Sequence, residues 1–70
     1  MYIELDDRTV GDEIHRLRKE HNLNQSQLAQ KANVSRCSIV NYENGYQVPT
    51  ILAARKIFHA LGIQEVRIRT

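Results

Sequence analysis

Two helix-capping residues only eleven positions apart, Asn24 and Ser35, constrain the fold of this chain more than any other feature. Each precedes apolar residues at helical spacing, as a capping residue does. Because one helix must end before the next begins, the spacing predicts short helices over about 25–32 and 36–43. Asn33 lies between them, and asparagine is the commonest non-glycine residue in the left-handed conformation that a tight bend requires.

Longer amphipathic helices are predicted on both sides of this pair. After Thr9, a capping candidate, apolar residues recur at helical spacing and predict a helix over about 10–21. Thr50 is the cap of another helix, which ends before Gly62, where a glycine is typical. Together with the short pair, these segments make four helices.

The two ends of the chain alternate apolar and polar residues, as half-buried strands do. These segments lie at about 2–5 and 65–69. The first is acidic and the second basic, so we expect a small antiparallel ribbon with opposite charges across the ladder. The alternative is that both ends are frayed. We predict one domain over 1–70, with its core in 9–63.

The composition suits one small soluble domain and argues against other classes. Of 70 residues, 41% are hydrophobic and 26% charged, and the longest apolar run has four residues, so no membrane partner is expected. A single cysteine, Cys37, allows no internal disulfide and favours the reducing cytoplasm. Neither a nucleophile–base pair, metal-ligand spacing nor a phosphate-binding glycine loop is present, so we expect no enzyme, cofactor or metal.

Positive charge gathers in one part of the chain. Residues 21–64 carry four Lys or Arg against the single acid Glu43, a net charge of +3, whereas residues 1–20 carry −2. This distribution and a pI near 9.0 permit a polyanionic partner.

The two short helices have an apolar side and a polar side. Their inward positions are Leu28, Ala29, Ala32, Val34, Ile39 and Tyr42. Four residues then point outward from the second short helix, chiefly from its N-terminal half: Arg36, Cys37, Ser38 and Asn41. That half of a recognition helix is the part that enters a DNA major groove.

The segment LNQSQLAQKANVSRCSIVNYENG resembles the phage Cro and repressor type of helix-turn-helix, the XRE family. RLRKEHNLNQ before it and the P-T and ALGI after it match as well, so the resemblance covers about Val10 to Ile63. It implies a mainly α fold, a compact four-helix lambda-repressor-like domain, here with short terminal strands. Two departures are Asn33 in place of the usual bend glycine and the strand-like QEVRIRT in place of a fifth helix.

The resemblance also implies roles for individual residues. Arg36, Cys37, Ser38 and Asn41 match base-reading positions, with Arg36 suited to guanine and Asn41 to adenine. Five residues near the helix ends are expected to contact phosphate: Asn24, Gln25, Ser35, Asn44 and Tyr46. Family members pair an arginine of the first helix with the glutamate that ends the third, and these positions hold Arg18 and Glu43, which we interpret as structural support.

Two functions from different classes fit these features. The first is a sequence-specific regulator, a repressor, that binds double-stranded DNA as a homodimer on a near-palindromic operator. The second is a protein-interaction module, such as an antitoxin-like neutraliser with autoregulatory DNA binding, whose terminal strands extend the sheet of a protein partner.

A chain this short and without disulfides also favours dimerisation. Possible dimer contacts are Leu52, Phe58, Val66 and Ile68. The alternative for Leu52 and Phe58 is an ordinary place in the core, and for Tyr46 it is packing over a loop.

Overall fold

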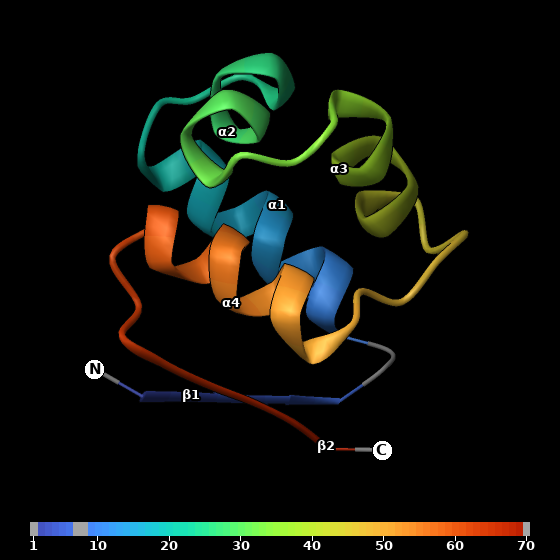
Figure 1. Ribbon diagram of the computed structural model, residues 1–70, viewed down its shortest axis with the longest axis vertical. Helices are drawn as coiled ribbons and strands as arrows, with labels where there is room; N and C mark the ends of the chain where they lie inside the picture. Colours follow the sequence, from blue (N-terminus) through green and yellow to red (C-terminus); the bar gives the residue numbers. More distant parts are fainter. Residues whose placement is uncertain (1, 7–8, 70) are drawn as a thin grey trace.

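Four helices lie over a pair of strands in the computed structural model, which describes residues 2–6 and 9–69, with the backbone alone at 2–5, 68 and 69 (Figure 1). In chain order the elements are β1 (Tyr2–Asp6), α1 (Val10–Glu20), α2 (Gln25–Ala32), α3 (Arg36–Glu43), α4 (Ile51–Ala60) and β2 (Glu65–Arg69). The predicted four-helix fold is confirmed, and the short bounds of α2 and α3 follow the two caps.

Side-chain caps begin three of the four helices. Asn24 and Gln27 form a reciprocal capping box at α2, with backbone-to-side-chain distances of 2.7 and 2.8 Å. Ser35 and Thr50 cap α3 and α4, each accepting a hydrogen bond from the backbone N–H three residues on. Each such cap contributes about 1 kcal/mol.

The predicted capping of α1 by Thr9 is wrong. Its backbone is helical rather than extended, and its side chain makes no bond to the first turn. Instead the Thr9 N–H donates to Asp6 Oδ1 at 3.0 Å, and the Thr9 hydroxyl lies 3.2 Å from the same oxygen. The side chain therefore stabilises the connection from β1 rather than the helix start.

Left-handed residues end the helices where the sequence predicts them. Asn33, predicted at the bend, has φ of 57°, and Gly62, predicted after the last helix, has φ of 84°. Asn22, just after α1, is left-handed as well, with φ of 56°. After Asn33 the chain turns sharply, and the Val34 N–H returns to the Ala29 carbonyl at 3.0 Å. This bend sets α3 across α2.

The core lies between the helices and is closed by β2. Among the described residues, the largest fully buried side chains are Phe58, Ile14, Leu28, Ile39, Ile57, Leu61 and Val10. Phe58 is 0% exposed and Val66 only 5%, and both belong to the core of their own chain. The prediction that they contact a second chain is therefore wrong, while the Ile68 side chain lies outside the described residues.

The two strands pair in parallel, so the predicted antiparallel direction is wrong. α4 runs across the molecule in the direction opposite to β1 (Figure 1). After α4 the chain turns back beneath this helix, and β2 therefore runs in the same direction as β1. The register sets Glu4 beside Arg67 and Asp6 beside Arg69. Acidic positions are thus paired with basic positions in this direction too, so charge alone did not fix the strand direction.

Gly11 marks the closest approach between α1 and the end of α3. A Cβ on Gly11 would collide with the Tyr42 carbonyl oxygen and lie 3.1 Å from the carbonyl carbon. These are backbone atoms, which cannot swing aside as a flexible side chain can. The absence of a side chain at Gly11 therefore allows α3 to lie this close to α1.

Gly11→Ala is expected to destabilise the protein by about 1–3 kcal/mol, because the cost of overpacking exceeds the gain of up to about 1 kcal/mol from replacing a helical glycine. The free energy of unfolding in urea measures the effect. Asp12→Ala, at the exposed neighbouring position of α1, is the control and should change stability by less than about 0.5 kcal/mol. A Gly11→Ala variant as stable as the native chain would contradict the steric argument.

Candidate nucleic-acid interface

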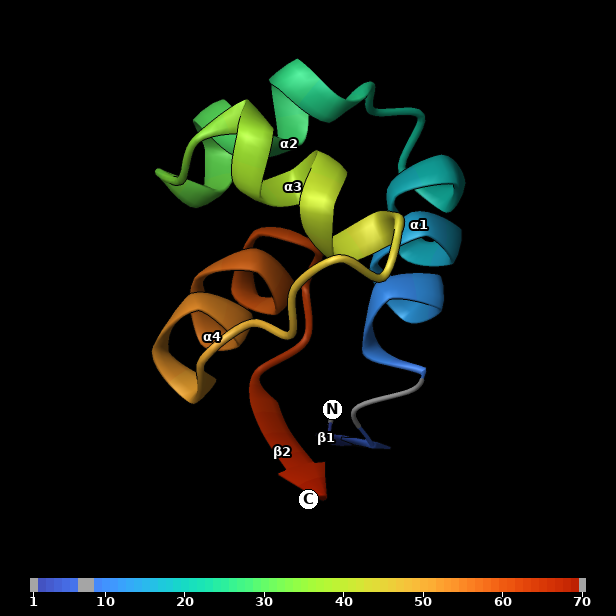
Figure 2. The same ribbon diagram turned by 90° about the vertical axis from the view of Figure 1, so that its right-hand side faces the viewer.

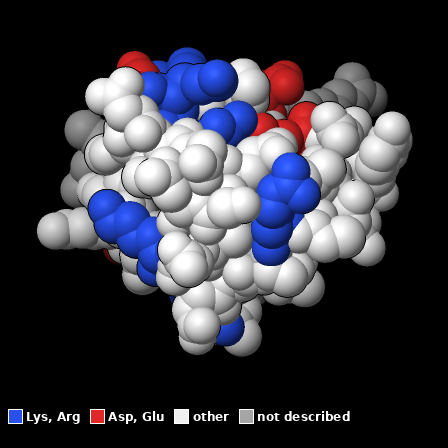
Figure 3. All heavy atoms as spheres, turned by 90° about the horizontal axis from the view of Figure 1, so that it is seen from above, with Lys and Arg blue, Asp and Glu red and all other residues white. Residues whose placement is uncertain are grey.

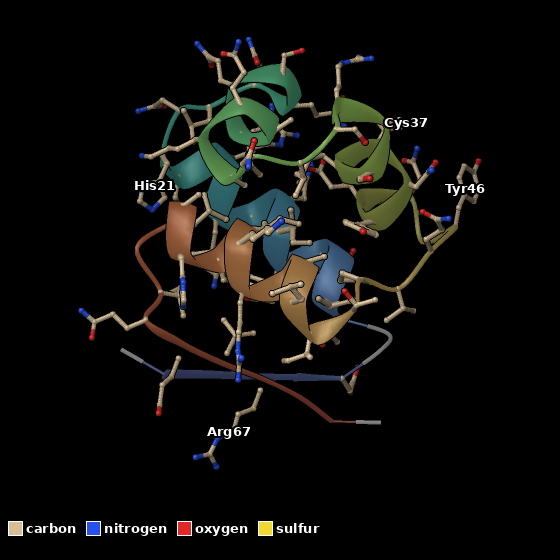
Figure 4. All side chains as sticks on the ribbon, viewed as in Figure 1. His21, Cys37, Tyr46 and Arg67 are labelled. Atoms are coloured by element: carbon tan, nitrogen blue, oxygen red, sulfur yellow. The ribbon has the colours of Figure 1, made fainter. Side chains whose placement is uncertain are left out.

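α2 and α3 form the end of the molecule opposite the strands (Figure 1). At the start of α3, Arg36 and Cys37 are exposed, and Figure 4 shows Cys37 pointing outward from this end. Asn41 follows one turn later, half-buried, with its Nδ2 3.8 Å from Cys37 Sγ. These three side chains therefore share one solvent-facing side of α3.

Ser38 is less available than its neighbours on α3. It is half-buried, and its hydroxyl lies 2.9 Å from that of Ser35, which also accepts the Ser38 N–H at 3.1 Å. Both serine hydroxyls are thus partly engaged in starting the helix. Ser38 therefore lies on the outer surface of α3, and its hydroxyl already forms a hydrogen bond with the Ser35 hydroxyl.

The residues expected to contact phosphate lie on both sides of α3. Asn24 and Ser35 are exposed helix caps, whereas Asn44 and Tyr46 follow α3, with Tyr46 77% exposed. The Tyr46 ring extends away from the molecule in Figure 4, which excludes packing over the loop. Gln25, by contrast, turns its side chain inward to donate to Glu43 Oε1 at 3.4 Å.

A buried polar network holds the three helices behind this surface. Glu43 Oε2 accepts from Arg18 Nε at 2.8 Å, and its other oxygen lies 3.0 Å from both Arg18 Nη2 and His15 Nδ1. Arg18 Nη1 also donates to the Leu23 carbonyl at 2.9 Å. With Gln25 as the remaining donor, the network joins α1, the start of α2 and the end of α3.

The network shifts the pKa values of its central pair. Burial by itself raises the pKa of the Glu43 carboxyl, but hydrogen bonds from its donors, Arg18 foremost, outweigh burial and hold this pKa below its ordinary value of 4.5. The hydrogen bond to Glu43 raises the pKa of Arg18. Their side chains are only 5% and 7% exposed, so the pair is ionised in a largely water-free position.

Arg18 and Glu43 were predicted from the sequence as a pair, but His15, the third member of this network on α1 and α3, was not. The signal was available, because His15 lies three residues before Arg18 and so on the same side of α1. Gly11 was missed too. Its importance depends on how near α3 lies, which no local pattern encodes.

Charge is sparse across the surface formed by α2 and α3. Figure 3 views this end from above and shows Lys and Arg side chains separated by uncharged surface, with the visible acidic side chains near one edge. A groove lies between α2 and the start of α3, and Arg36 is the one charged residue among its described lining residues. Such a surface offers mainly uncharged hydrogen-bonding groups.

Two other kinds of site find no support. No group of three His, Cys, Asp or Glu that could hold a metal occurs in residues 2–6 and 9–69. Within the part of the chain that the structure describes, no helix has the length and apolar character needed to span a membrane.

A short helix, a left-handed bend and a second short helix with an exposed polar side define a helix-turn-helix DNA-binding domain. A helix-turn-helix family model matches residues 14–68. The Immunity repressor protein of Bacillus phage phi105 is 43% identical over 56 residues, which cover 80% of this chain and 39% of that protein. The chain belongs to the Cro/repressor-type helix-turn-helix (XRE) family of DNA-binding transcription regulators, which are not enzymes.

The relative is much longer than the matched region. This chain spans about two-fifths of the length of the phage protein it matches. No solved structure matches the chain.

Glu43→Gln is expected to lower the free energy of unfolding at pH 7 by about 3–5 kcal/mol, because it leaves the buried Arg18 guanidinium without its counter-ion. Since the pKa of folded Glu43 lies below 4.5, its contribution is present above that pH and is lost as the pH falls through the folded value. The stability difference between native and variant chains should therefore shrink below pH 4.5. Urea unfolding between pH 7 and 2.5 measures it.

Glu13→Gln is the matched control. Glu13 pairs with Arg16 at 2.7 Å, but the side chains are 26% and 54% exposed, so its removal should cost no more than about 1 kcal/mol. A difference between the native chain and Glu43→Gln that stays constant down to pH 2.5 would contradict the linkage.

Proposed function

We propose that the chain is a sequence-specific repressor that binds double-stranded DNA as a homodimer, with α3 as the recognition helix. The observation that supports this proposal best is the outer side of α3, where Arg36, Cys37 and Asn41 are presented from a helix whose far end is anchored by Glu43. Repression is inferred from the phage relative, an immunity repressor. Such a regulator works in the cytoplasm, where its operator is.

Base reading is assigned to the side chains on this side of α3. Arg36 makes no hydrogen bond or ion pair with the described residues, so its fork of donors is free to bind guanine O6 and N7. Asn41 suits the N6 and N7 of adenine, while Cys37 and Ser38 supply small contacts between them. Each bidentate pair contributes about 1–3 kcal/mol of discrimination.

Phosphate contacts are assigned to the residues that flank α3. The Asn24 amide N–H2, Ser35, Asn44 and the Tyr46 hydroxyl are exposed at helix ends or just beyond them. Gln25 contributes through the N-terminus of α2, because its side chain is engaged with Glu43. With few Lys and Arg on this surface, we expect only a modest dependence of affinity on salt.

The homodimer explains how so small a surface reaches operator specificity. A two-fold dimer presents two α3 helices to half-sites about one helical turn, ~10 bp, apart, so the operator is nearly palindromic. Each base contact is then used twice on one site.

A protein-interaction role is the second candidate. The described sheet has two strands that pair only with each other, which leaves the other edge of each strand unpaired by the sheet. An extended segment of a protein partner could add to such an edge. Recovery of one stoichiometric partner with the expressed chain, together with no preference among DNA sequences, would favour this role.

Selection of binding sites from a random duplex pool tests the repressor proposal. We expect a near-palindrome enriched at least about a thousandfold over random DNA at physiological salt, the lower range for specific binders. Arg36→Ala should lose about 1–3 kcal/mol of discrimination at one base pair of each half-site. Affinity measured for the selected site and its single-base variants gives this value.

Lys56→Ala is the matched control, because it removes the same charge from an exposed position on α4. It should leave the base preference unchanged. Equal affinity for all duplexes, or an Arg36→Ala variant with native base preference, would contradict the assignment.

A further inference from the structure

The groove between α2 and the start of α3 is lined mainly by uncharged polar side chains. It encloses about 510 Å³, far more than the roughly 30 Å³ that one water molecule occupies in the liquid. No Asp or Glu occurs among the described residues that line it. Its polar lining extends from the cap of α2 to the first residue of α3, and all of these residues are exposed: Asn24, Ser26, Gln27, Gln30, Asn33 and Arg36.

The capping box of α2 decides which atoms of two amides remain available. Asn24 Oδ1 accepts the Gln27 backbone N–H at 2.7 Å, and Gln27 Oε1 accepts the Asn24 backbone N–H at 2.8 Å. Because both oxygens are engaged, the fold itself sets the orientation of the two amides. Their NH2 groups make no hydrogen bond with the described residues, and an NH2 group can only donate. The cap of α2 therefore presents two oriented donors at the groove.

Gln30 and Asn33 continue this side of α2 as far as the bend. They follow Gln27 by three and six residues, a spacing that keeps side chains on one side of a helix. Neither side chain makes a hydrogen bond with the described residues. The bend requires the positive φ of Asn33, but a glycine would meet that requirement without a side chain. The amide of Asn33 is therefore not explained by the bend.

The ligand that suits this lining is an oxygen-rich anion. Four amides and the Arg36 guanidinium supply donors, and no described carboxylate in the groove repels an anion. Asparagine and glutamine side chains commonly donate to phosphate oxygens in protein–DNA complexes. The groove lies at the end of the molecule opposite the two strands, where Figure 2 shows α2 and α3 together. The anion presented at this end is a phosphate of the duplex that α3 reads.

We propose that Gln27, Gln30 and Asn33 hold a phosphate of the operator in this groove, a contact that rests on the proposed function and adds to it. The phosphate lies between α2 and Arg36, so it fixes where the DNA backbone runs relative to the guanidinium assigned to guanine. Phosphate contacts carry no sequence information themselves, but they set the register in which bases are read. Neutral donors make this contact without a cation, in keeping with the modest salt dependence expected for this surface.

Three substitutions remove or reverse the donors and keep the fold. Gln30→Ala removes one amide and leaves a good helix former. Asn33→Gly removes another and leaves a residue that adopts a positive φ freely. Gln27→Glu keeps an oxygen for the Asn24 N–H, so the capping box survives, but it replaces the NH2 donor by a negative oxygen. The controls are Gln64→Ala and Gln64→Glu, which make the same changes at an exposed position outside the groove.

Affinity is measured for the selected palindrome, for its single-base variants and for random duplex DNA. Each groove variant should bind all of these at least about tenfold more weakly, the effect of losing one hydrogen bond to a charged group. The preference among bases should not change, because the lost contact is to phosphate. Both Gln64 variants should bind nearly as the native chain does, and urea unfolding checks that every variant is folded.

A neutral methylphosphonate, placed at each phosphate of the palindrome in turn, locates the contact. At one phosphate of each half-site the native chain should lose affinity, whereas Gln30→Ala and Asn33→Gly should lose much less, because their bond is already missing. Native affinity in all three groove variants, or equal losses in native and variant chains at every methylphosphonate, would overturn the groove contact and leave the repressor intact. Weaker binding of the groove variants to random duplex, in a chain that prefers no sequence, would instead overturn the repressor and leave the groove contact.

Discussion

The buried carboxylate of Glu43 is the constraint on which the surface formed by α2 and α3 depends. One side chain at the end of α3 binds groups from α1 and from the start of α2, and Arg18 links the same cluster to the α1–α2 connection. Replacing a buried ion pair by apolar residues can leave stability unchanged, so its presence says more about geometry than about stability. Here it fixes where α3 ends relative to its two neighbours. The position of the outer side of α3 therefore depends on that contact.

Two small residues then set the spacing that the network needs. Gly11 brings the backbone of α1 against the end of α3, and Ala29, 4% exposed, lies where α2 meets the bend into α3. A larger side chain at Gly11 would collide with the backbone of α3, move α3 away and lengthen the bonds to Glu43. Polar network and close packing therefore depend on each other, since hydrogen bonds of 2.8–3.0 Å tolerate little displacement.

Features that depend on a few neighbouring residues could be predicted from the sequence. The caps at Asn24, Ser35 and Thr50 and the left-handed Asn33 each depend on contacts within four residues, so the sequence specified them correctly. The strand direction depends instead on the path of α4, and the burial of Phe58 on all the helices together. Thr9 is an exception among the local features, because Asp6, only three residues before it, bonds the hydroxyl that the capping rule gives to the helix.

The polar residues of the helix pair differ in how far the fold itself already engages their side chains. Ser35 and Asn24 hold helix starts, and Gln25 joins the Glu43 network, so their side chains help to define the shape of the surface. Arg36, at the first position of α3, has no such bond within the described structure. The Arg36 guanidinium, which the fold does not use, therefore lies on a helix whose two ends are fixed. Ser35 fixes the start of α3, and Glu43 fixes its end. Rigid support and an unengaged donor set are together what direct base reading requires, because discrimination depends on bidentate geometry rather than on charge alone.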